Sequence, residues 1–308
     1  MLQNAIYKVE HYWNKLLIRA KKVTFPGFDG MPLYDVGVFF WRSIVDGAIT
    51  TRASAIAFSF FMALFPAIIF LFTLIPYIPI HDFQDELLTI IHNLVPGNVY
   101  IAIDETVQDI ITQPRGDLLS LGFFMALVFS TNGLASMMSA FDASLHSFER
   151  RTWIGQRFIA IVLLAILVSM LTITIGLLTG GQYLINSAVE HGLLKDNFTY
   201  YLLLIGKWVV IVTLFFFGNS FFYYLAPAKK TKWRFISAGS TLSTLLSIIT
   251  VIGFTYYINN FGQYNKLYGS IGTLLVILFL MYILSVILLI GFELNASINE
   301  AHRQALDK

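Results

Sequence analysis

The sequence predicts an all-α polytopic membrane protein with six transmembrane helices. Of its 308 residues, 57% are hydrophobic and 12% are charged, whereas about 25% charged residues is usual for soluble domains. Six runs with few or no charges are each long enough to cross a bilayer, which takes about 20 helical residues. Lys and Arg gather in every second connection between these runs. Together these observations exclude an ordinary water-soluble domain.

The first run has 28 uncharged residues, from Ala53 to Ile80. Seven Lys and Arg residues precede it, whereas the segment that follows it, residues 81–117, has only one positively charged residue, Arg115. Because positive charge stays on the cytoplasmic side, the N-terminus is predicted to lie inside. Pro66 falls within the run and removes a backbone donor, so we expect a kink there.

Five further runs follow, and their lengths suit transmembrane helices. They cover residues 118–141, 158–181, 200–227, 235–258 and 269–292. Six crossings return the C-terminus to the cytoplasm and leave 16 Lys and Arg residues inside against four outside or near the outer side. This bias agrees with the positive-inside rule. The predicted regions are therefore a cytoplasmic N-terminal part (1–52), a transmembrane domain (53–295) and a cytoplasmic tail (296–308).

Shorter amphipathic segments are predicted outside the spans. Residues 2–20 and 34–49 each place apolar side chains on one helical face, and the second segment offers Phe39, Phe40 and Trp41 to the membrane interface. Both could anchor the chain to the membrane, or contact a partner or a gate. Residues 81–117 are rich in acidic side chains and break at Pro96, so we expect an outer helical hairpin.

Small polar residues gather in the inner half of the second span, where Thr131, Asn132 and Ser136 lie. The first interpretation is close packing against a neighbouring helix, with hydroxyls that bond across the contact. The alternative is a lining for a polar path.

Charged residues stand at the predicted inner ends of three spans: Arg52, Asp142 and Glu293. Each would be costly against lipid, so we expect Arg52 to pair with Glu293 or with Asp142. Such a pair could fix the helix bundle or form a substrate or proton site. Lys207 lies inside the fourth span and is a functional candidate, unless it extends outward to the interface.

Catalytic signatures are missing from the sequence. It has no phosphate-binding G-x-x-x-x-G-K-[ST] loop, no H-E-x-x-H and no G-x-S-x-G, and it contains no cysteine. Its six histidines are scattered over both predicted sides of the membrane. We therefore predict neither an enzyme nor a bound cofactor or metal. The expected partners are membrane lipids, and not nucleic acid; a homo-oligomer is compatible with these features.

Several motifs in order resemble the YihY/BrkB family of bacterial inner-membrane proteins. They occupy residues 53–66, 224–234, 264–272 and 289–296. The resemblance implies six spans in a bacterial cytoplasmic membrane and an activity that is not settled. The family also carries the label ribonuclease BN, but RNA hydrolysis needs clustered carboxylates or histidines beside a basic surface, and the inner loops offer none. Two residues depart from the family pattern: Phe292 stands where alanine is expected, and Asp142 where asparagine is expected.

These features predict transport or export of an amphiphilic or lipid-like solute without ATP hydrolysis. The supporting features are the proline in the first span, the polar residues of the second, Lys207 and the inner-end charges. The alternative is a scaffold or regulator of envelope assembly that transports nothing, in which the same residues only pack helices.

Overall fold

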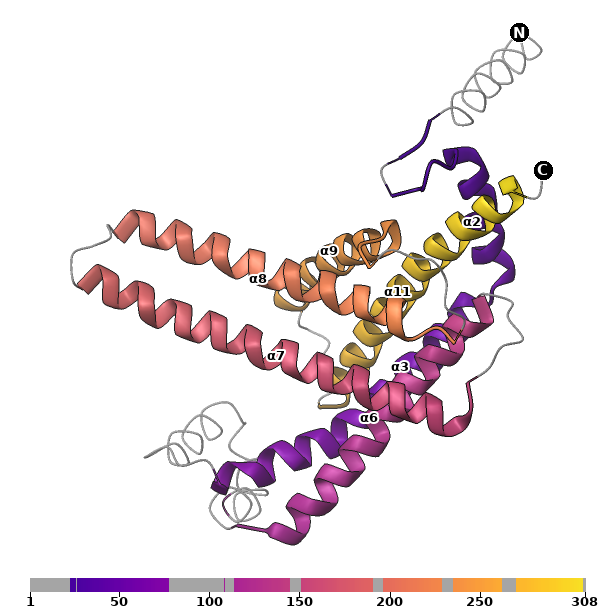
Figure 1. The fold of residues 1–308 in the computed structure, drawn as a ribbon. Coiled ribbons are helices and arrows are strands. Elements are labelled where there is room, and N and C mark those ends of the chain that lie inside the picture. Colours follow the sequence, from indigo (N-terminus) through magenta and orange to yellow (C-terminus); the bar gives the residue numbers. More distant parts are fainter. Residues whose placement is uncertain are drawn as a thin grey trace. The chain divides into compact units, whose positions relative to one another are not determined.

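A computed structural model describes residues 23–25, 27–77, 108, 114–144, 151–190, 196–228, 235–261 and 270–306. Its elements are α2 (Leu33–Asp46), α3 (Ile49–Leu74), η1 (Ile75–Tyr77), α6 (Gly116–Ser144), α7 (Trp153–Glu190), α8 (Asp196–Leu225), α9 (Ala238–Phe261) and α11 (Ser270–Leu306) (Figure 1). Six of these helices are long and apolar enough to cross a membrane. No strand occurs in these ranges. The prediction of an all-α protein with six spans is confirmed.

The chain divides into two compact units, and the boundary between them crosses α3 and α6. The smaller unit is Phe58–Gly133. Within it, α6 approaches α3 closely at Gly122, because a Cβ at this position would lie 3.2 Å from the backbone of Phe70. Small residues allow this kind of close contact between transmembrane helices. Pro66 is buried inside α3, which continues to Leu74.

The larger unit comprises Met1–Ala57 and Leu134–Lys308. In it, α11 packs against α9 and α2, and α8 packs against α7 and α9 (Figure 1). The tightest crossing is between α9 and α11, where a Cβ added to Gly239 would overlap the carbonyl oxygen of Gly291. The two backbones therefore touch without intervening side chains.

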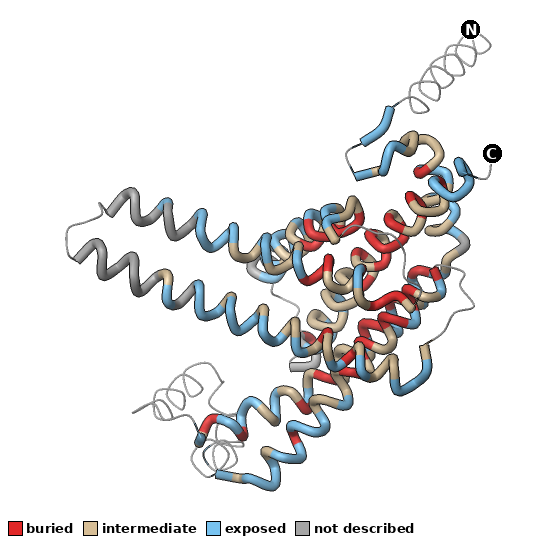
Figure 2. The backbone as a smooth tube through the Cα atoms, in the orientation of Figure 1, coloured by how far each residue is buried: buried red, intermediate tan, exposed pale blue. Residues whose placement is uncertain are grey.

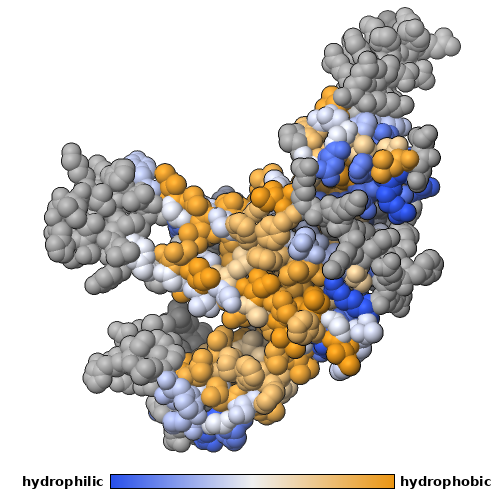
Figure 3. Space-filling model, viewed as in Figure 1, coloured by the Kyte–Doolittle hydropathy of each residue, from blue (hydrophilic) through white to orange (hydrophobic). Residues whose placement is uncertain are grey.

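Burial is uneven along α7 and α8 (Figure 2). Near its start α7 buries Ala160 and Leu163, and near its end α8 buries Ser220 and Tyr223. The residues described in the opposite half of each helix are mostly exposed and include large apolar side chains: Leu171 and Ile173 in α7, and Ile205 and Val209 in α8. Figure 3 shows apolar side chains along these helices. In a bilayer such a surface suits contact with lipid tails.

Helix bounds differ from the predicted runs in three places. We expected the third span to end near Gly180 and Gly181, but α7 continues through them to Glu190. A glycine costs a helix only about 1 kcal/mol relative to alanine, so two glycines do not end a helix that neighbouring residues support. In addition, α8 begins at Asp196, and α11 continues to Leu306, so most of the predicted tail is helical.

Two predicted amphipathic segments lie outside the described residues: the helix at 2–20, and the outer hairpin at 81–117 apart from Gln108 and residues 114–117. The segment predicted at 34–49 corresponds to α2. There Phe39 packs against α11 and Phe40 is half-buried, whereas Trp41 is exposed. Helical periodicity identified α2, but only the packing distinguishes its two apolar faces.

Candidate functional site

Arg52 is positioned by a break between two helices. After α2, Ala48 adopts a left-handed conformation with φ of 46°, and α3 begins at Ile49. A cation is unfavourable in the first turn of a helix, so Arg52 gains nothing from its own helix end. Its side chain instead bonds to α6 and α11. The Nη1 group donates to the carbonyl oxygen of Ala140 at 2.8 Å and to the Oγ of Ser144 at 2.5 Å.

Glu293 on α11 accepts the remaining bond from the guanidinium. The Nη2 of Arg52 lies 2.6 Å from Glu293 Oε1, and Ser144 Oγ donates to the same oxygen at 2.6 Å. The side chain of Glu293 is 1% exposed and that of Arg52 is 13% exposed. Arg52, Ser144 and Glu293 therefore form a buried polar cluster, which we call the ion-pair cluster, and it joins three helices.

Two atoms of the ion-pair cluster are buried without a hydrogen-bond partner among the described residues: Glu293 Oε2 and Arg52 Nε. The buried Oγ of Ser297, one helical turn after Glu293, also lacks a hydrogen-bond partner within the described part of the chain. Buried polar groups in proteins are nearly always hydrogen-bonded, so each unbonded atom requires an explanation. The cluster is consequently able to accept a hydrogen bond from a small polar molecule at Oε2.

Aromatic rings lie beside the ion-pair cluster: Phe292 precedes Glu293, and Phe141 follows Ala140, whose carbonyl oxygen accepts from Arg52. Phe141 and Phe292 are fully buried and stack at 4.0 Å with an interplanar angle of 2°. Tyr223 meets both rings edge-on, at 5.7 and 5.9 Å. The unexpected Phe292 is thus a packing residue. Apolar surroundings of this kind lower the local dielectric constant and strengthen an ion pair.

Asp142 and Arg151 hold the C-terminal end of α8. Arg151 donates to the carbonyl oxygens of Leu225, Ala226 and Pro227 at 3.1, 2.9 and 2.7 Å, and Asp142 Oδ1 accepts from the Ala228 amide at 2.8 Å. The last carbonyls of a helix lack partners and favour a cation. Burial lowers the pKa of Arg151 from its ordinary value, and the attraction of Asp142 opposes that shift.

We expect Arg151→Gln to lower the stability of the folded protein by about 2 kcal/mol, because hydrogen bonds to charged groups contribute roughly 1.5–3 kcal/mol. The measurement is the thermal midpoint of the detergent-purified protein. Arg303→Gln is the matched control, because Arg303 is 62% exposed and makes only a weak pair with Glu300. Equal midpoints for the two variants would show that Arg151 does not hold the end of α8.

A stripe of buried hydroxyls on α9 was not identified from the sequence. Its members follow helical spacing and are at most 5% exposed: Ser240, Ser243, Thr244 and Ser247. Ser243 lies 2.5 Å from the hydroxyl of Tyr223, which also donates to the carbonyl oxygen of Leu288 at 2.8 Å. The i, i+3, i+4, i+7 spacing of small polar residues in an apolar run was the signal that could have revealed this packed face.

The other predicted site residues are not members of the ion-pair cluster. Thr131 is buried, and its hydroxyl donates to the carbonyl oxygens of Leu127 and Val128 in its own helix. Asn132 and Ser136 are half-buried on α6. Lys207 is exposed on α8, and the described part of the chain gives it neither a hydrogen bond nor an ion pair.

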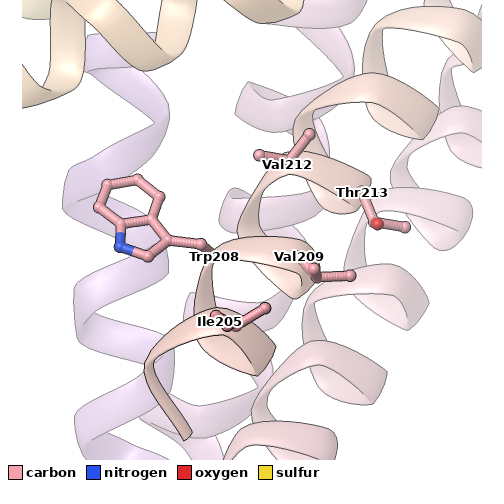
Figure 4. Close-up of a pocket in the computed structure, with 5 residues that line it drawn as sticks. All are labelled: Ile205, Trp208, Val209, Val212 and Thr213. Atoms are coloured by element: carbon pink, nitrogen blue, oxygen red, sulfur yellow. The ribbon is translucent and has the colours of Figure 1, made fainter. Parts of the chain in front are cut away.

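An apolar groove of about 340 Å³ lies along α8 close to Lys207 in sequence. It is lined by one face of the helix: Ile205, Trp208, Val209, Val212 and Thr213 (Figure 4). Among the residues that the structure describes, no three His, Cys, Asp or Glu side chains come together as metal ligands. The candidate site is therefore the buried ion pair, and the groove is a separate shallow hollow on one face of α8.

Six apolar helices, three of which bury a charged cluster between them, define the class: a polytopic α-helical membrane protein. Within that class the chain belongs to the virulence factor BrkB family, whose model matches residues 40–308. The family resemblance of the sequence motifs is confirmed.

Three relatives illustrate the family. The ribonuclease-like protein YfkH of Bacillus subtilis (strain 168) is 26% identical over 250 residues, which are 81% of this chain and 90% of that protein. A UPF0761 membrane protein of Tolumonas auensis is 23% identical, over 85% of this chain and 84% of its own length. Another, of Xanthomonas axonopodis pv. citri (strain 306), is 24% identical over 94% of this chain, which spans only 64% of that relative. No solved structure matches the chain.

Proposed function

We propose that this protein moves an amphiphilic or lipid-like solute across the bacterial cytoplasmic membrane without hydrolysing ATP, with both termini in the cytoplasm. The observation that carries the proposal is the buried pair of Arg52 and Glu293, which are 2.6 Å apart. Ionisable groups inside membrane spans are costly and are functional candidates by default. Replacing a buried ion pair with well-packed apolar residues often leaves the stability of a protein unchanged or raises it. Stability alone therefore does not explain the pair, and its presence favours a role in function.

The bonding of the pair suggests how it takes part in transport. Arg52 connects the start of α3 to the end of α6 and to α11, and Ser144 bonds to both charges. Separation of Arg52 from Glu293 would release these helix ends from one another. Glu293 Oε2, which has no hydrogen-bond partner among the described residues, is able to accept a hydrogen bond from a polar group of the solute at that moment. The cluster would act as a closure at the predicted inner side.

The groove on α8 supports an amphiphilic solute. It is formed by apolar side chains of one helix and has a volume of about 340 Å³. A groove that opens on the lipid-facing surface can receive an acyl chain directly from the bilayer. Lys207 is also exposed on α8, but the helical repeat of 3.6 residues places it on the side of the helix opposite the groove residues. The apolar lining by itself favours lipid-like solutes over small polar ones.

A scaffold without a substrate is the second candidate. It is favoured by the contact of α9 with α11, where Gly239 and Gly291 bring the two backbones together and buried hydroxyls are bonded across the interface. Such packing suits a bundle that does not rearrange. On this alternative, the Arg52–Glu293 pair only fixes the helix ends.

Glu293→Gln distinguishes the two candidates. Glutamine keeps the shape of the side chain but removes its charge, and Arg52 is partly exposed and keeps its bonds to Ala140 and Ser144, so a transporter variant should accumulate normally and lose at least tenfold in rate. A scaffold variant should lose protein level and thermal stability. The rate is the transfer of NBD-labelled phosphatidylglycerol between leaflets of reconstituted vesicles, measured by dithionite quenching. Glu300→Gln, on the exposed face of the same helix, is the control.

The outcome is decisive in each direction. Two results together would show that the proposal of lipid-like transport is wrong. Wild-type protein would not accelerate transfer above the rate in protein-free vesicles, and the lipids that copurify with wild type would also copurify with Lys207→Ala and Glu293→Ala. Normal level and normal transfer in Glu293→Gln would discard both roles for this carboxylate.

A further inference from the structure

The helix α2 has two apolar faces, and its neighbours cover only one of them. On the covered face, Val36 is 1% exposed and forms a small core with Ile298 and Ala301 of α11. Phe39 and Leu294 pack against this core. The contact fixes α2 beside the last turns of α11, so the opposite face of α2 must point away from that helix.

The uncovered face carries three large apolar side chains at helical spacing. Val38 is 48% exposed, Trp41 is 69% exposed and Val45 is 62% exposed. Their i, i+3, i+7 spacing places them in one row, which we call the Trp41 face. Arg42 is exposed beside this row. A single exposed apolar residue is ordinary on a protein surface, but a continuous row with tryptophan at its centre indicates contact with something apolar.

The packing of α2 determines its depth relative to a membrane. The uncharged run of α11 extends from Ser270 to Phe292, and at about 1.5 Å per residue Glu293 lies about 35 Å beyond Ser270. This length covers the hydrocarbon core of roughly 30 Å, so the charge that ends the run, Glu293, lies at its boundary. Ile298 and Ala301, which hold Val36, are then about 7 and 12 Å beyond that boundary.

The chain between Val36 and Arg52 returns toward the boundary, since Arg52 bonds to Glu293. Trp41 and Val45 lie on this return path, before the turn at Gly47 and Ala48 that leads into α3. They are therefore closer to the hydrocarbon core than Val36, at the depth where lipid headgroups meet acyl chains. Tryptophan side chains are enriched at this depth because the ring is apolar and its N–H is polar.

We propose that the Trp41 face of α2 inserts into the boundary between headgroups and acyl chains of the bilayer leaflet at this side of the protein. The exposed Arg42 suits a leaflet that contains anionic lipid. A water-exposed position would leave the row of Val38, Trp41 and Val45 uncovered. This inference concerns the membrane surface and does not depend on the proposed transport function.

Single-cysteine labelling tests the proposal, because the chain contains no cysteine of its own. Val38→Cys and Val45→Cys would each be labelled with bimane in the full-length protein. The protein would be reconstituted in vesicles of phosphatidylethanolamine and phosphatidylglycerol. Gln304→Cys is the control, since Gln304 is exposed near the end of α11 and lies about 16 Å beyond Glu293.

Lipids brominated on their acyl chains should quench both α2 labels at least twofold more than the Gln304 label, and aqueous iodide should show the reverse order. Adding Trp41→Gln to the Val45→Cys variant should reduce lipid quenching of its label at least twofold. Labels on α2 that respond to iodide like the Gln304 label would overturn the proposal. Labels that neither quencher reaches would also overturn it, because they would indicate a protein partner. Two label positions keep the test decisive if one variant fails to fold.

Discussion

Replacement of Gly291 by alanine will prevent most of the protein from accumulating in a folded form. A Cβ at Gly291 would overlap the Oγ of Ser243 and would lie 2.5 Å from the hydroxyl of Tyr223 and 2.6 Å from the carbonyl oxygen of Gly239. One of these neighbours is backbone, so a side-chain rotation cannot relieve the clash. Overpacking a well-filled core costs about 1–3 kcal/mol and occasionally more, and we expect at least about 3 kcal/mol here.

Gly253→Ala is the matched control, because Gly253 lies in α9, one of the two helices that cross here, and a Cβ there meets nothing within 4 Å. It should leave the protein unchanged or stabilise it by up to about 1 kcal/mol. The readouts are the amount of monodisperse protein after extraction and its thermal midpoint. Similar behaviour of Gly291→Ala and Gly253→Ala would show that α9 and α11 do not touch as described.

Arg52→Ala should have the second largest effect and lower stability by about 3–5 kcal/mol, because it leaves the buried carboxylate of Glu293 without its positive partner. Glu293 is 1% exposed, so water cannot replace the lost guanidinium. Thermal midpoints of the purified variants measure the loss.

The double variant Arg52→Met with Glu293→Met separates the charge effect from the loss of packing. It removes both charges and keeps apolar volume, so it should recover most of the stability that Arg52→Ala loses. If the double variant is as unstable as the sum of its single variants, the two residues do not interact. A double-mutant cycle gives the coupling directly.

Much of the fold could be predicted because transmembrane helices are determined by local composition. A run such as Ala53 to Ile80 is stable in lipid only as a helix, because a helix satisfies all its backbone hydrogen bonds internally. Helix ends were less certain. Nothing local required α7 to pass Gly180 or α11 to continue to Leu306, and both extensions depend on neighbouring residues and packing.

Part of the candidate site could be predicted as well. Arg52 and Glu293 were identified as costly charges, but the sequence offered Asp142 as an equal partner for Arg52. Asp142 accepts a bond from Ala228 beside Arg151 in the structure. The roles of Arg151 and of the hydroxyl stripe around Ser243 were missed, because both depend on which helix lies opposite.

The sequence by itself determined six apolar helices, the charges placed at their ends and the family, because hydrophobic length and motif order are properties of the linear chain. Only the tertiary structure decided that Arg52 meets Glu293, that Gly239 and Gly291 let two backbones touch, and that α2 turns Trp41 away from α11. These contacts join residues far apart in sequence, and helix faces of similar composition become different only when a particular neighbour covers one of them.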